Sequence, residues 1–405
     1  MIIQRLLFKT LRDEVNNPKI TVLTGSRQTG KTTALKNLLE ELPNGRYLSF
    51  DNISDLTLFT NNPDLFAEQY IDPYDQLFLD EFQYAPQGGK ILKYLYDRLQ
   101  KGKKLFISGS SGPDLAIHSL QFLTGRVSLI EAHPLSFAEF LSFKDSEKKV
   151  LLTKERTSQD FEQISNYLAE YLCYGGYPGV VISENKEMEL ENFINIYLLK
   201  EIREILNYKN HFEFDTLLRH LATRDSQLLN ISNLAIDTGI NRNKVKELLS
   251  ILEKTYLLHQ LRPYFSNKTK ELIKSPKTYL ADLGLKNILL RNFNPIHLRQ
   301  DKGAILESFI LNTLTQHGKL PHFWNEANQH EMDFVLAENG RIIGIEVKSN
   351  LPDLKLSPSV KTFIQKHQPE IVYVFNLNIQ GKQQLGKTEI IFTHLLNIFN
   401  SGILD

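Results

Sequence analysis

The sequence predicts an α/β protein of several domains, and three observations carry this prediction. The chain has 405 residues, which is long for a single hydrophobic core. Apolar runs typical of buried parallel strands alternate with helical patterns in the first third. A second group of strand-like runs lies near the C-terminus, after a series of short helical patterns. We therefore expect two α/β parts with a mainly helical region between them.

The composition is that of a globular protein, with 41% hydrophobic and 23% charged residues. Lysine plus arginine equals aspartate plus glutamate, 47 each, so binding of nucleic acid would need a local basic patch. The single cysteine, Cys173, excludes an intrachain disulfide and is typical of a reducing cytosol. The N-terminal run reads as an amphipathic helix without export-signal features, and no run approaches the roughly 20 apolar residues that span a membrane. The expectation is a cytoplasmic protein.

A phosphate-binding loop is predicted after the β-branched strand pattern that ends at Gly25. Gly25, Gly30, Lys31 and Thr32 fit G-x-x-x-x-G-K-T, and a strand before it and a helix after it separate such a loop from a chance match. Lys31 is expected to reach the β- and γ-phosphates, and the Thr32 hydroxyl to bind Mg²⁺. The predicted nucleotide-binding residues are Gly25, Ser26, Arg27, Gln28, Thr29, Gly30, Lys31, Thr32 and Thr33.

The hydrolytic part of this site is predicted in "QLFLDEFQ", an apolar strand that ends in two carboxylates. Asp80 is expected to hold Mg²⁺ together with Thr32. Glu81 is expected to polarise a water molecule for in-line attack on the γ-phosphate. Lys31 and Glu81 are thus the central catalytic candidates.

Two further catalytic candidates come later in the chain. The apolar strand "KLFISGSS" delivers Ser108, Ser110 and Ser111 to the same sheet edge. Ser110 or Ser111 is a candidate γ-phosphate sensor, and an ordinary turn serine is the alternative. Arg126 follows a glycine and is a candidate for stabilising transition-state charge, in its own subunit or across the interface of a homo-oligomer. A surface salt bridge is the alternative for Arg126.

Six motifs in combination resemble a large group of prokaryotic AAA-type ATPases with a C-terminal domain of unknown function: "GSRQTGKTT", "LDEFQ", "ISGSS", "LTGR", "PLSFAEF" and "GGYPGV". The resemblance runs over essentially the whole chain. It implies a P-loop AAA-type ATPase sheet with ATP as the nucleotide and ATP hydrolysis as the activity. It says little about the biological task.

A winged helix is predicted in the middle of the chain, after a charged surface excursion and a helical lid. Two helical patterns meet at Gly239, with Asn241 as the N-cap of the second, and read as helix-turn-helix. Two strand-like runs then suggest a wing. Residues 241–277 hold nine basic and three acidic residues. A further helical pattern precedes these two, so the helix after Asn241 is the third of the module. The candidate DNA contacts at the start of this third helix are Arg242, Asn243, Lys244 and Lys246. The alternative is a module that packs against the ATPase or a protein partner.

The C-terminal part resembles the PD-(D/E)xK nuclease core, an α/β fold, through D-x(12)-E-x-K on a hairpin after an acidic helix. Residues i and i+2 of a strand face the same side, so Glu346 and Lys348 project together. Asp333 and Glu346 are expected Mg²⁺ ligands, Lys348 is expected to position or deprotonate water, and Glu307 to complete or flank the site. The alternatives are a cross-face charge pair and a nuclease-like fold without activity.

The predicted domains are therefore an ATPase core (1–142), a helical lid or linker (143–210), a winged helix (211–290) and a nuclease-like domain (291–405). One hypothesis for the function is an enzyme that couples ATP and Mg²⁺ to action on DNA. The other is an ATP-dependent regulatory or scaffold protein whose distal domains bind a protein partner. The oligomeric state is open.

Overall fold

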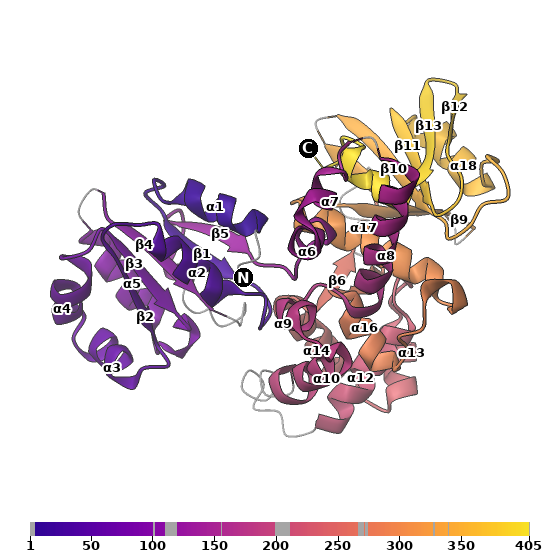
Figure 1. Cartoon of the computed structure of the whole chain (residues 1–405). Helices are drawn as coiled ribbons and strands as arrows, with labels where there is room; N and C mark the ends of the chain where they lie inside the picture. The colour runs from indigo at the N-terminus through magenta and orange to yellow at the C-terminus, as the bar shows by residue number, and fades with distance from the viewer. Residues whose placement is uncertain are drawn as a thin grey trace.

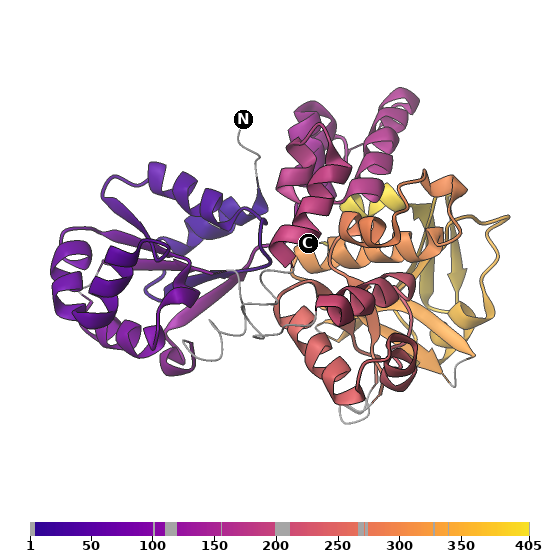
Figure 2. The same ribbon diagram turned by 90° about the horizontal axis from the view of Figure 1, so that it is seen from below.

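The computed structural model describes residues 5–99, 102–109, 120–154, 156–198, 211–265, 271, 274–326, 329–338 and 340–404. They form two lobes, which lie side by side in Figure 1 and in the rotated view of Figure 2. The first lobe holds the N-terminal third of the chain. The second lobe holds the rest. Within the described part of the chain, no helix is long and apolar enough to cross a membrane.

The first lobe is built on a five-stranded parallel sheet with the order β2-β3-β4-β1-β5. Its strands are β1 (Ile20–Thr24), β2 (Gly45–Ser49), β3 (Gln76–Asp80), β4 (Lys104–Ser108) and β5 (Val127–Glu131). Every residue of β1 and β4 is buried, because helices cover both faces of a parallel sheet. The predicted α/β class is confirmed for this lobe.

Two layers of helices cover the first sheet (Figure 1). The helical segments are α1 (Leu6–Glu14), α2 (Lys31–Glu40), α3 (Ile53–Asn61), α4 (Pro63–Phe66), η1 (Ala67–Ile71), η2 (Phe82–Tyr84), α5 (Gly88–Asp97) and η4 (Leu120–Leu123). Helices α1 and α2 share one apolar core with Phe78 and Phe106. Helices α3 and α5 share another, which contains Phe59 and Leu92. Because all five strands are parallel, their carboxyl ends form one edge of the sheet, where α2 begins.

The second lobe starts with short helices around one long helix. They are α6 (Phe137–Lys144), α7 (Ser146–Val150), α8 (Ser158–Tyr174), α9 (Pro178–Ile182), α10 (Lys186–Asn192) and η5 (Phe193–Leu198). The expectation of a surface excursion before α8 is wrong in part, because α7 is helical and Leu152 is buried in the same core as Ile164. Helix α8 begins with a capping box of Thr157 and Asp160 and ends at Gly175, whose φ is 73°.

The next unit, here called the helix–hairpin module, comprises residues 211–290. It contains α12 (His211–Thr223), α13 (Ile231–Thr238), α14 (Arg242–Lys254), β6 (Leu258–Leu261), β7 (Lys277–Leu280) and α16 (Leu283–Leu290). Strands β6 and β7 pair antiparallel. Gly239 ends α13 with a φ of 70°, and the Asn241 side chain accepts a hydrogen bond from the Asn243 amide at the start of α14. The predicted cap of this helix is confirmed.

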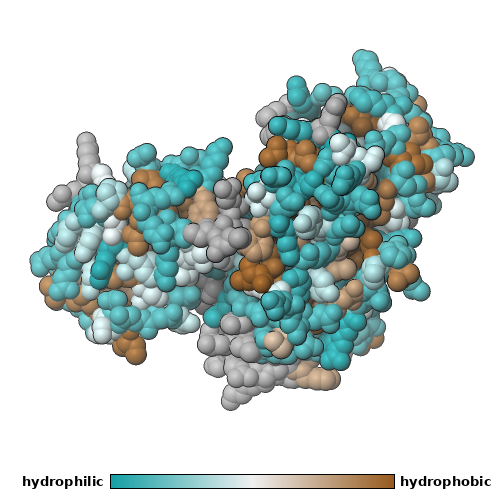
Figure 3. Space-filling view, viewed as in Figure 1, coloured by the Kyte–Doolittle hydropathy of each residue, from teal (hydrophilic) through white to brown (hydrophobic). Residues whose placement is uncertain are grey.

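The C-terminal module has a six-stranded mixed sheet in the order β12-β13-β11-β10-β9-β8. Its elements are η6 (Ile296–Leu298), α17 (Lys302–Gln316), β8 (His322–Glu326), β9 (His330–Glu338), β10 (Arg341–Val347), α18 (Pro358–His367), β11 (Ile371–Asn376), β12 (Gly381–Leu385), β13 (Thr388–His394) and η7 (Leu395–Asn400). Helices α17 and α18 belong to different apolar cores, so the sheet lies between them. Figure 3 shows a largely hydrophilic surface with separate small apolar patches on both lobes.

Candidate nucleotide site and its surroundings

The loop between β1 and α2 has a backbone that favours glycine. Gly25 and Gly30 have φ values of 136° and 86°, in a region that residues with a side chain rarely adopt. A Cβ atom on Gly25 would lie 2.2 Å from the carbonyl oxygen of Ala132, so no side chain fits there. All nine residues predicted to bind nucleotide lie in this loop or in the first turn of α2.

The ammonium group of Lys31 lies inside the loop. Lys31 is 7% exposed, and its Nζ donates hydrogen bonds to the carbonyl oxygens of Gly25 at 2.8 Å and Ser26 at 2.7 Å. The Thr29 hydroxyl donates to the carbonyl of Ser26 at 2.9 Å. Lys31 is also the first residue of α2, and the dipole at the N-terminal end of a helix favours a bound anion.

Asp80 ends β3 as a buried carboxylate surrounded by hydroxyl groups. Its Oδ2 accepts hydrogen bonds from Thr32 Oγ1 at 2.6 Å and from the Tyr47 hydroxyl at 2.7 Å. Its Oδ1 accepts one from the Ser108 hydroxyl. Burial, followed by the hydrogen bond to Asp80, raises the pKa of Tyr47, so this phenol stays protonated. The structure thus joins Thr32 and Asp80 as predicted, and it adds Tyr47 from β2, which no motif indicated.

Glu81 follows Asp80 with a φ of 54°. Such a backbone conformation is uncommon outside glycine and tends to occur at functional sites. Burial raises the pKa of the Glu81 carboxyl, although a hydrogen bond from Gln83 acts in the opposite direction. A carboxylate with a raised pKa is suited to accept a proton.

The structure contradicts a role for Arg126 at the nucleotide of its own subunit. Strands β1 and β5 are parallel with Ile20 opposite Val127, so Arg126 lies at the amino edge of the sheet. Gly25 lies at the carboxyl edge, six residues or roughly 20 Å further along. The guanidinium of Arg126 instead forms an ion pair with Asp97 at 3.0 Å. Motif order alone did not reveal the strand direction.

Ser110 and Ser111, the candidate γ-phosphate sensors, lie outside the described residues. Ser108, the first serine of that run, is fully buried. Its hydroxyl donates a hydrogen bond to the carboxylate of Asp80, so Ser108 helps to hold that carboxylate in position.

Two residues that were not among the predicted site residues also reach the phosphate-binding loop. Arg5, which precedes α1, donates hydrogen bonds to the carbonyl oxygens of Thr29 and, at 2.6 Å, His133. The hydroxyl of Tyr177 lies 3.3 Å from the hydroxyl of Ser26. Tyr177 belongs to "GGYPGV", one of the six motifs that carry the family resemblance, but the sequence did not predict its contact with the loop. Part of the expected lid thus contacts the loop through one side chain.

A third such residue, Tyr256, comes from the helix–hairpin module. It follows α14 with a φ of 61°, and its hydroxyl donates to Thr24 Oγ1 at 2.9 Å. Thr24 is the last residue of β1 before the loop. The end of α14 is therefore in contact with the strand that carries the phosphate-binding loop.

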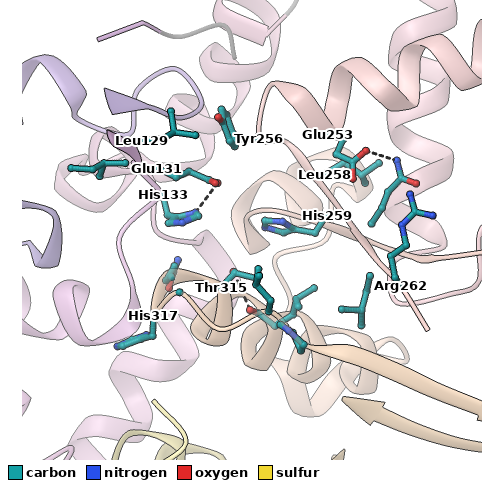
Figure 4. A pocket seen from close by; sticks show the side chains of 18 of the residues that line it. Leu129, Glu131, His133, Glu253, Tyr256, Leu258, His259, Arg262, Thr315 and His317 are labelled. Carbon is teal, nitrogen blue, oxygen red and sulfur yellow. Dashed lines mark hydrogen bonds and ion pairs between the residues drawn. The ribbon is translucent and has the colours of Figure 1, made fainter. Parts of the chain in front are cut away.

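A cavity of about 930 Å³ lies between the lobes beside Tyr256. In Figure 4 the side chains of Glu131 and His133 face this cavity from the first lobe, opposite His259 of β6. Burial raises the pKa of Glu131 to about 7. Burial lowers the pKa of His259 to about 4 and that of His133 to about 3, with smaller contributions to His133 from His259 and Arg5. Both histidines are therefore uncharged at neutral pH.

The predicted DNA contacts lie at the N-terminal end of α14. Arg242, Asn243 and Lys246 are exposed. Lys244 is half-buried and pairs with Glu247 at 2.9 Å. Of the nine basic residues counted in 241–277, two lie outside the described residues, and Lys277 is buried and does not contribute to a basic surface.

The four nuclease-like candidates lie close together in the C-terminal module. Glu307 comes from α17, Asp333 from β9, and Glu346 and Lys348 from β10 and the residues that follow it. The Val347 amide donates to Asp333 Oδ2 at 2.8 Å, and Lys348 Nζ pairs with Glu346 Oε1 at 2.6 Å. Burial, then the charge of Asp333, raises the pKa values of Glu307 and Glu346.

These acidic residues do not converge as metal ligands in this structure. Across the described ranges, no group of three or more His, Cys, Asp and Glu side chains is arranged to hold a metal ion. Two residues that sequence analysis did not assign to this cluster contact Glu307 from β7: Lys277 at 3.7 Å and the Tyr279 hydroxyl at 3.2 Å. Nothing local in the sequence indicated this contact between modules.

Three family profiles match separate parts of the chain. Residues 17–141 match a family described as "AAA domain". Residues 165–295 and 302–394 match two families that are each described as a domain of unknown function. The first match covers the sheet, the phosphate-binding loop and Asp80.

Three relatives that are similar over most of their length are described as uncharacterized proteins. One from Methanocaldococcus jannaschii is 27% identical, with coverage of 81% of this chain and 74% of the relative. One from Mycobacterium tuberculosis is 25% identical, with coverage of 84% of this chain and 72% of the relative. One from Haemophilus influenzae is 24% identical, with 82% and 83% covered.

One solved structure with some likeness is that of the Aeropyrum pernix ORC2 protein in its ADP form, with a TM-score of 0.31. The sequence identity is 12%, and the match covers 72% of this chain and 95% of that chain. The replication initiator DnaA, bound to AMPPCP and single-stranded DNA, gives a TM-score of 0.30 and 14% identity over 62% and 90%. At these scores the two structures carry no argument about this chain. The profile match and the site geometry together support an AAA-type domain in the first lobe.

Proposed function

We propose that this protein is a Mg²⁺-dependent ATPase whose first lobe couples ATP turnover to DNA binding by the second lobe. The observation that carries the ATPase part is the hydrogen bond of 2.6 Å between Thr32 and Asp80, beside the buried ammonium of Lys31. A hydroxyl and a carboxylate so placed are the ligands that a P-loop ATPase offers to Mg²⁺.

The residues present fit ATP and Mg²⁺. Gly25 and Gly30 give the loop a backbone conformation with positive φ that residues with a side chain rarely adopt, and Thr32 and Asp80 supply hard oxygen ligands. When bound, Mg²⁺ would neutralise charge on the phosphate oxygens. Lys31 would exchange its two carbonyl partners for the β- and γ-phosphates of the substrate.

Glu81 is the proposed general base for hydrolysis. It would accept a proton from the attacking water as the water oxygen bonds to the γ-phosphorus and the bond to the bridging oxygen of ADP breaks. Its burial supports this role, because a raised pKa brings a carboxylate closer to the operating pH. Ser110 and a trans-acting Arg126 remain proposals for further groups in this reaction.

The proposed coupling to DNA is supported by the contact of Tyr256 with Thr24. We propose that the helix–hairpin module is a winged helix, with α14 as the recognition helix. Its exposed N-terminal residues Arg242, Asn243 and Lys246, with Lys244 beside them, are the proposed DNA contacts. A movement of α14 on DNA would then act on the strand before the phosphate-binding loop.

The first experiment is phosphate release from ATP and Mg²⁺, with and without single-stranded, duplex and branched DNA. Lys31→Ala sets the background. Hydrolysis that depends on Lys31 and rises with one form of DNA is the expected result. A rate no higher than that of Lys31→Ala contradicts the ATPase proposal, and a rate that ignores every DNA contradicts the coupling.

DNA binding is tested with the triple variant Arg242→Glu, Lys244→Glu and Lys246→Glu in a gel-shift assay. A matched control makes the same charge change at three exposed lysines elsewhere: Lys93→Glu, Lys154→Glu and Lys361→Glu. Loss of DNA retention in the first variant alone is expected. Equal retention by both variants contradicts α14 as the DNA-binding element.

One observation favours a second candidate function, an ATP-dependent regulatory or scaffold protein with a protein partner. The acidic residues of the proposed nuclease-like domain do not converge on a metal position in the described chain. Mg²⁺-dependent nicking of DNA that Asp333→Ala and Lys348→Ala both abolish would favour the nuclease instead. Nicking that persists equally in both variants would come from a contaminant.

A further inference from the structure

We propose that Lys277 is the resident cation of the acidic cluster in the C-terminal module. In this role it neutralises the carboxylates in place of a divalent metal ion and ties the helix–hairpin module to the C-terminal sheet. The proposal concerns the second lobe alone and does not depend on ATP hydrolysis.

Lys277 is inserted into the cluster from another module. It opens β7 of the hairpin and is 4% exposed. Its Nζ forms ion pairs with Glu331 of β9 and, at 3.7 Å, with Glu307 of α17. A lysine is seldom fully buried unless it is paired, and here both partners belong to the C-terminal module. The ion pairs therefore cross the boundary between two modules.

Tyr279 supports the same contact. It lies two residues after Lys277, so the two side chains share one face of β7. The Tyr279 hydroxyl donates to Glu307 Oε2 at 3.2 Å, the same oxygen that Lys277 approaches. Glu307 thus has two partners from β7 and serves as an anchor for the hairpin.

The cluster holds more carboxyl groups than ammonium groups. Four carboxyl groups, those of Glu307, Glu331, Asp333 and Glu346, face two ammonium groups, those of Lys277 and Lys348. Lys348 pairs with one oxygen of Glu346. The other oxygen, Oε2, is buried and has no hydrogen-bond partner among the described residues. An unpartnered buried carboxylate oxygen beside other carboxylates is a binding feature for a cation.

Lys277 is held in this setting by ion pairs of its ammonium group to Glu307 of α17 and Glu331 of β9. In the described chain, the carboxyl groups of the cluster do not converge on a metal position. A divalent ion could bind with these ligands only if Lys277 left the cluster.

The test is Mn²⁺ binding to the full chain by isothermal titration, without nucleotide. The proteins are the wild type, Lys277→Met, Asp333→Asn and Lys277→Met with Asp333→Asn. Methionine keeps the length of the side chain and removes its charge. The first lobe is unchanged in every protein, so any Mn²⁺ bound there cancels in the comparison.

We expect Lys277→Met to bind one Mn²⁺ per chain more than the wild type, and the added Asp333→Asn to remove that ion. The proposal is overturned if Lys277→Met binds no more than the wild type. It is also overturned if the wild type already binds an ion that Asp333→Asn alone removes.

Thermal unfolding tests separately whether Lys277 holds the helix–hairpin module and the C-terminal module together. Lys277→Met leaves buried carboxylates uncompensated, so its melting temperature is expected to fall by several degrees. Lys277→Met with Glu331→Gln removes one charge of each sign and is expected to recover at least half of the loss. A double variant no more stable than Lys277→Met overturns the proposal, and this comparison holds even if the single variant is poorly folded.

Discussion

The hydroxyl of Tyr256 donates a hydrogen bond of 2.9 Å to the hydroxyl of Thr24, although the two residues are 232 positions apart in the chain. The Thr24 hydroxyl in turn lies 3.3 Å from the carbonyl oxygen of Ile130 and donates to it. A short chain of hydrogen bonds therefore runs from the end of α14 through β1 to β5. It connects the proposed DNA-binding element with both strands next to the phosphate-binding loop.

Tyr256→Phe removes the first of these bonds and leaves the second. We expect a loss of about 1 kcal/mol in unfolding free energy, the usual contribution of one hydrogen bond. Basal ATP turnover is expected to stay within about twofold, since Thr24 keeps its bond to Ile130, while any stimulation by DNA falls. Phosphate release with and without DNA measures this, with Tyr264→Phe as the control. Undiminished stimulation would show that coupling takes another route.

Asp80→Asn and Glu81→Gln are expected to fail at different steps. Asp80→Asn weakens the Mg²⁺ site, so ATP binding and turnover both fall. Glu81→Gln keeps the metal ligands and removes the base, so ATP still binds while turnover falls by about 10²-fold or more. Binding of a fluorescent ATP analogue and single-turnover hydrolysis separate the two steps. Equal loss of analogue binding in both variants would contradict the separate roles.

Arg126→Ala tests the position of this arginine at the far edge of the sheet. Its partly exposed ion pair with Asp97 contributes at most about 1 kcal/mol, so stability should change little. Turnover is expected to match the wild type at low protein concentration. A tenfold loss that appears only at concentrations where the protein self-associates would instead support action across a subunit interface.

His394 gives a pH dependence of stability with a defined sign. Its Nδ1 accepts a hydrogen bond from the Leu396 amide at 3.2 Å, which requires the neutral ring. Burial, with a smaller contribution from Arg156, lowers its pKa from 6.5 to about 4. The folded state thus binds fewer protons than the unfolded state between these values, so the stabilisation is present above pH 6.5 and is lost as the pH falls towards 4.

His394→Asn keeps an N-cap acceptor and removes the titration. The pH-dependent part of the unfolding free energy between pH 6.5 and 4 should shrink by up to roughly 3 kcal/mol, at about 1.4 kcal/mol for each unit of pKa shift. Urea unfolding at a series of pH values measures it. A curve parallel to that of the wild type would contradict the prediction.

The ATPase core was predictable because its signals are local. The glycines at 25 and 30, Lys31, Thr32 and the carboxylates at the end of β3 each follow from a few neighbouring residues and the strand or helix beside them. The N-cap Asn241 and the helix end at Gly239 were predictable for the same reason.

The remaining features of the sites depend on contacts between distant segments. Tyr47, Arg5, Tyr177 and Tyr256 reach the loop or Asp80 from other elements, and no spacing in the sequence reports such packing. Arg126 was misplaced because a motif gives the order of residues but not the edge of the sheet at which they emerge. Lys277 was counted among the basic residues of 241–277, but it is buried. Its burial depends on packing against the C-terminal module, which no local pattern in the sequence reports.

The order of the first sheet has a mechanical consequence. Strand β1, which ends in the phosphate-binding loop, lies directly beside β5, from which the chain crosses into the second lobe. The crossing segment passes so close to the loop that Ala132 touches the space where Gly25 lacks a side chain. The phosphate-binding loop therefore lies directly against the segment that joins the two lobes. Any change in the backbone at Gly25 has to be accommodated by that connection.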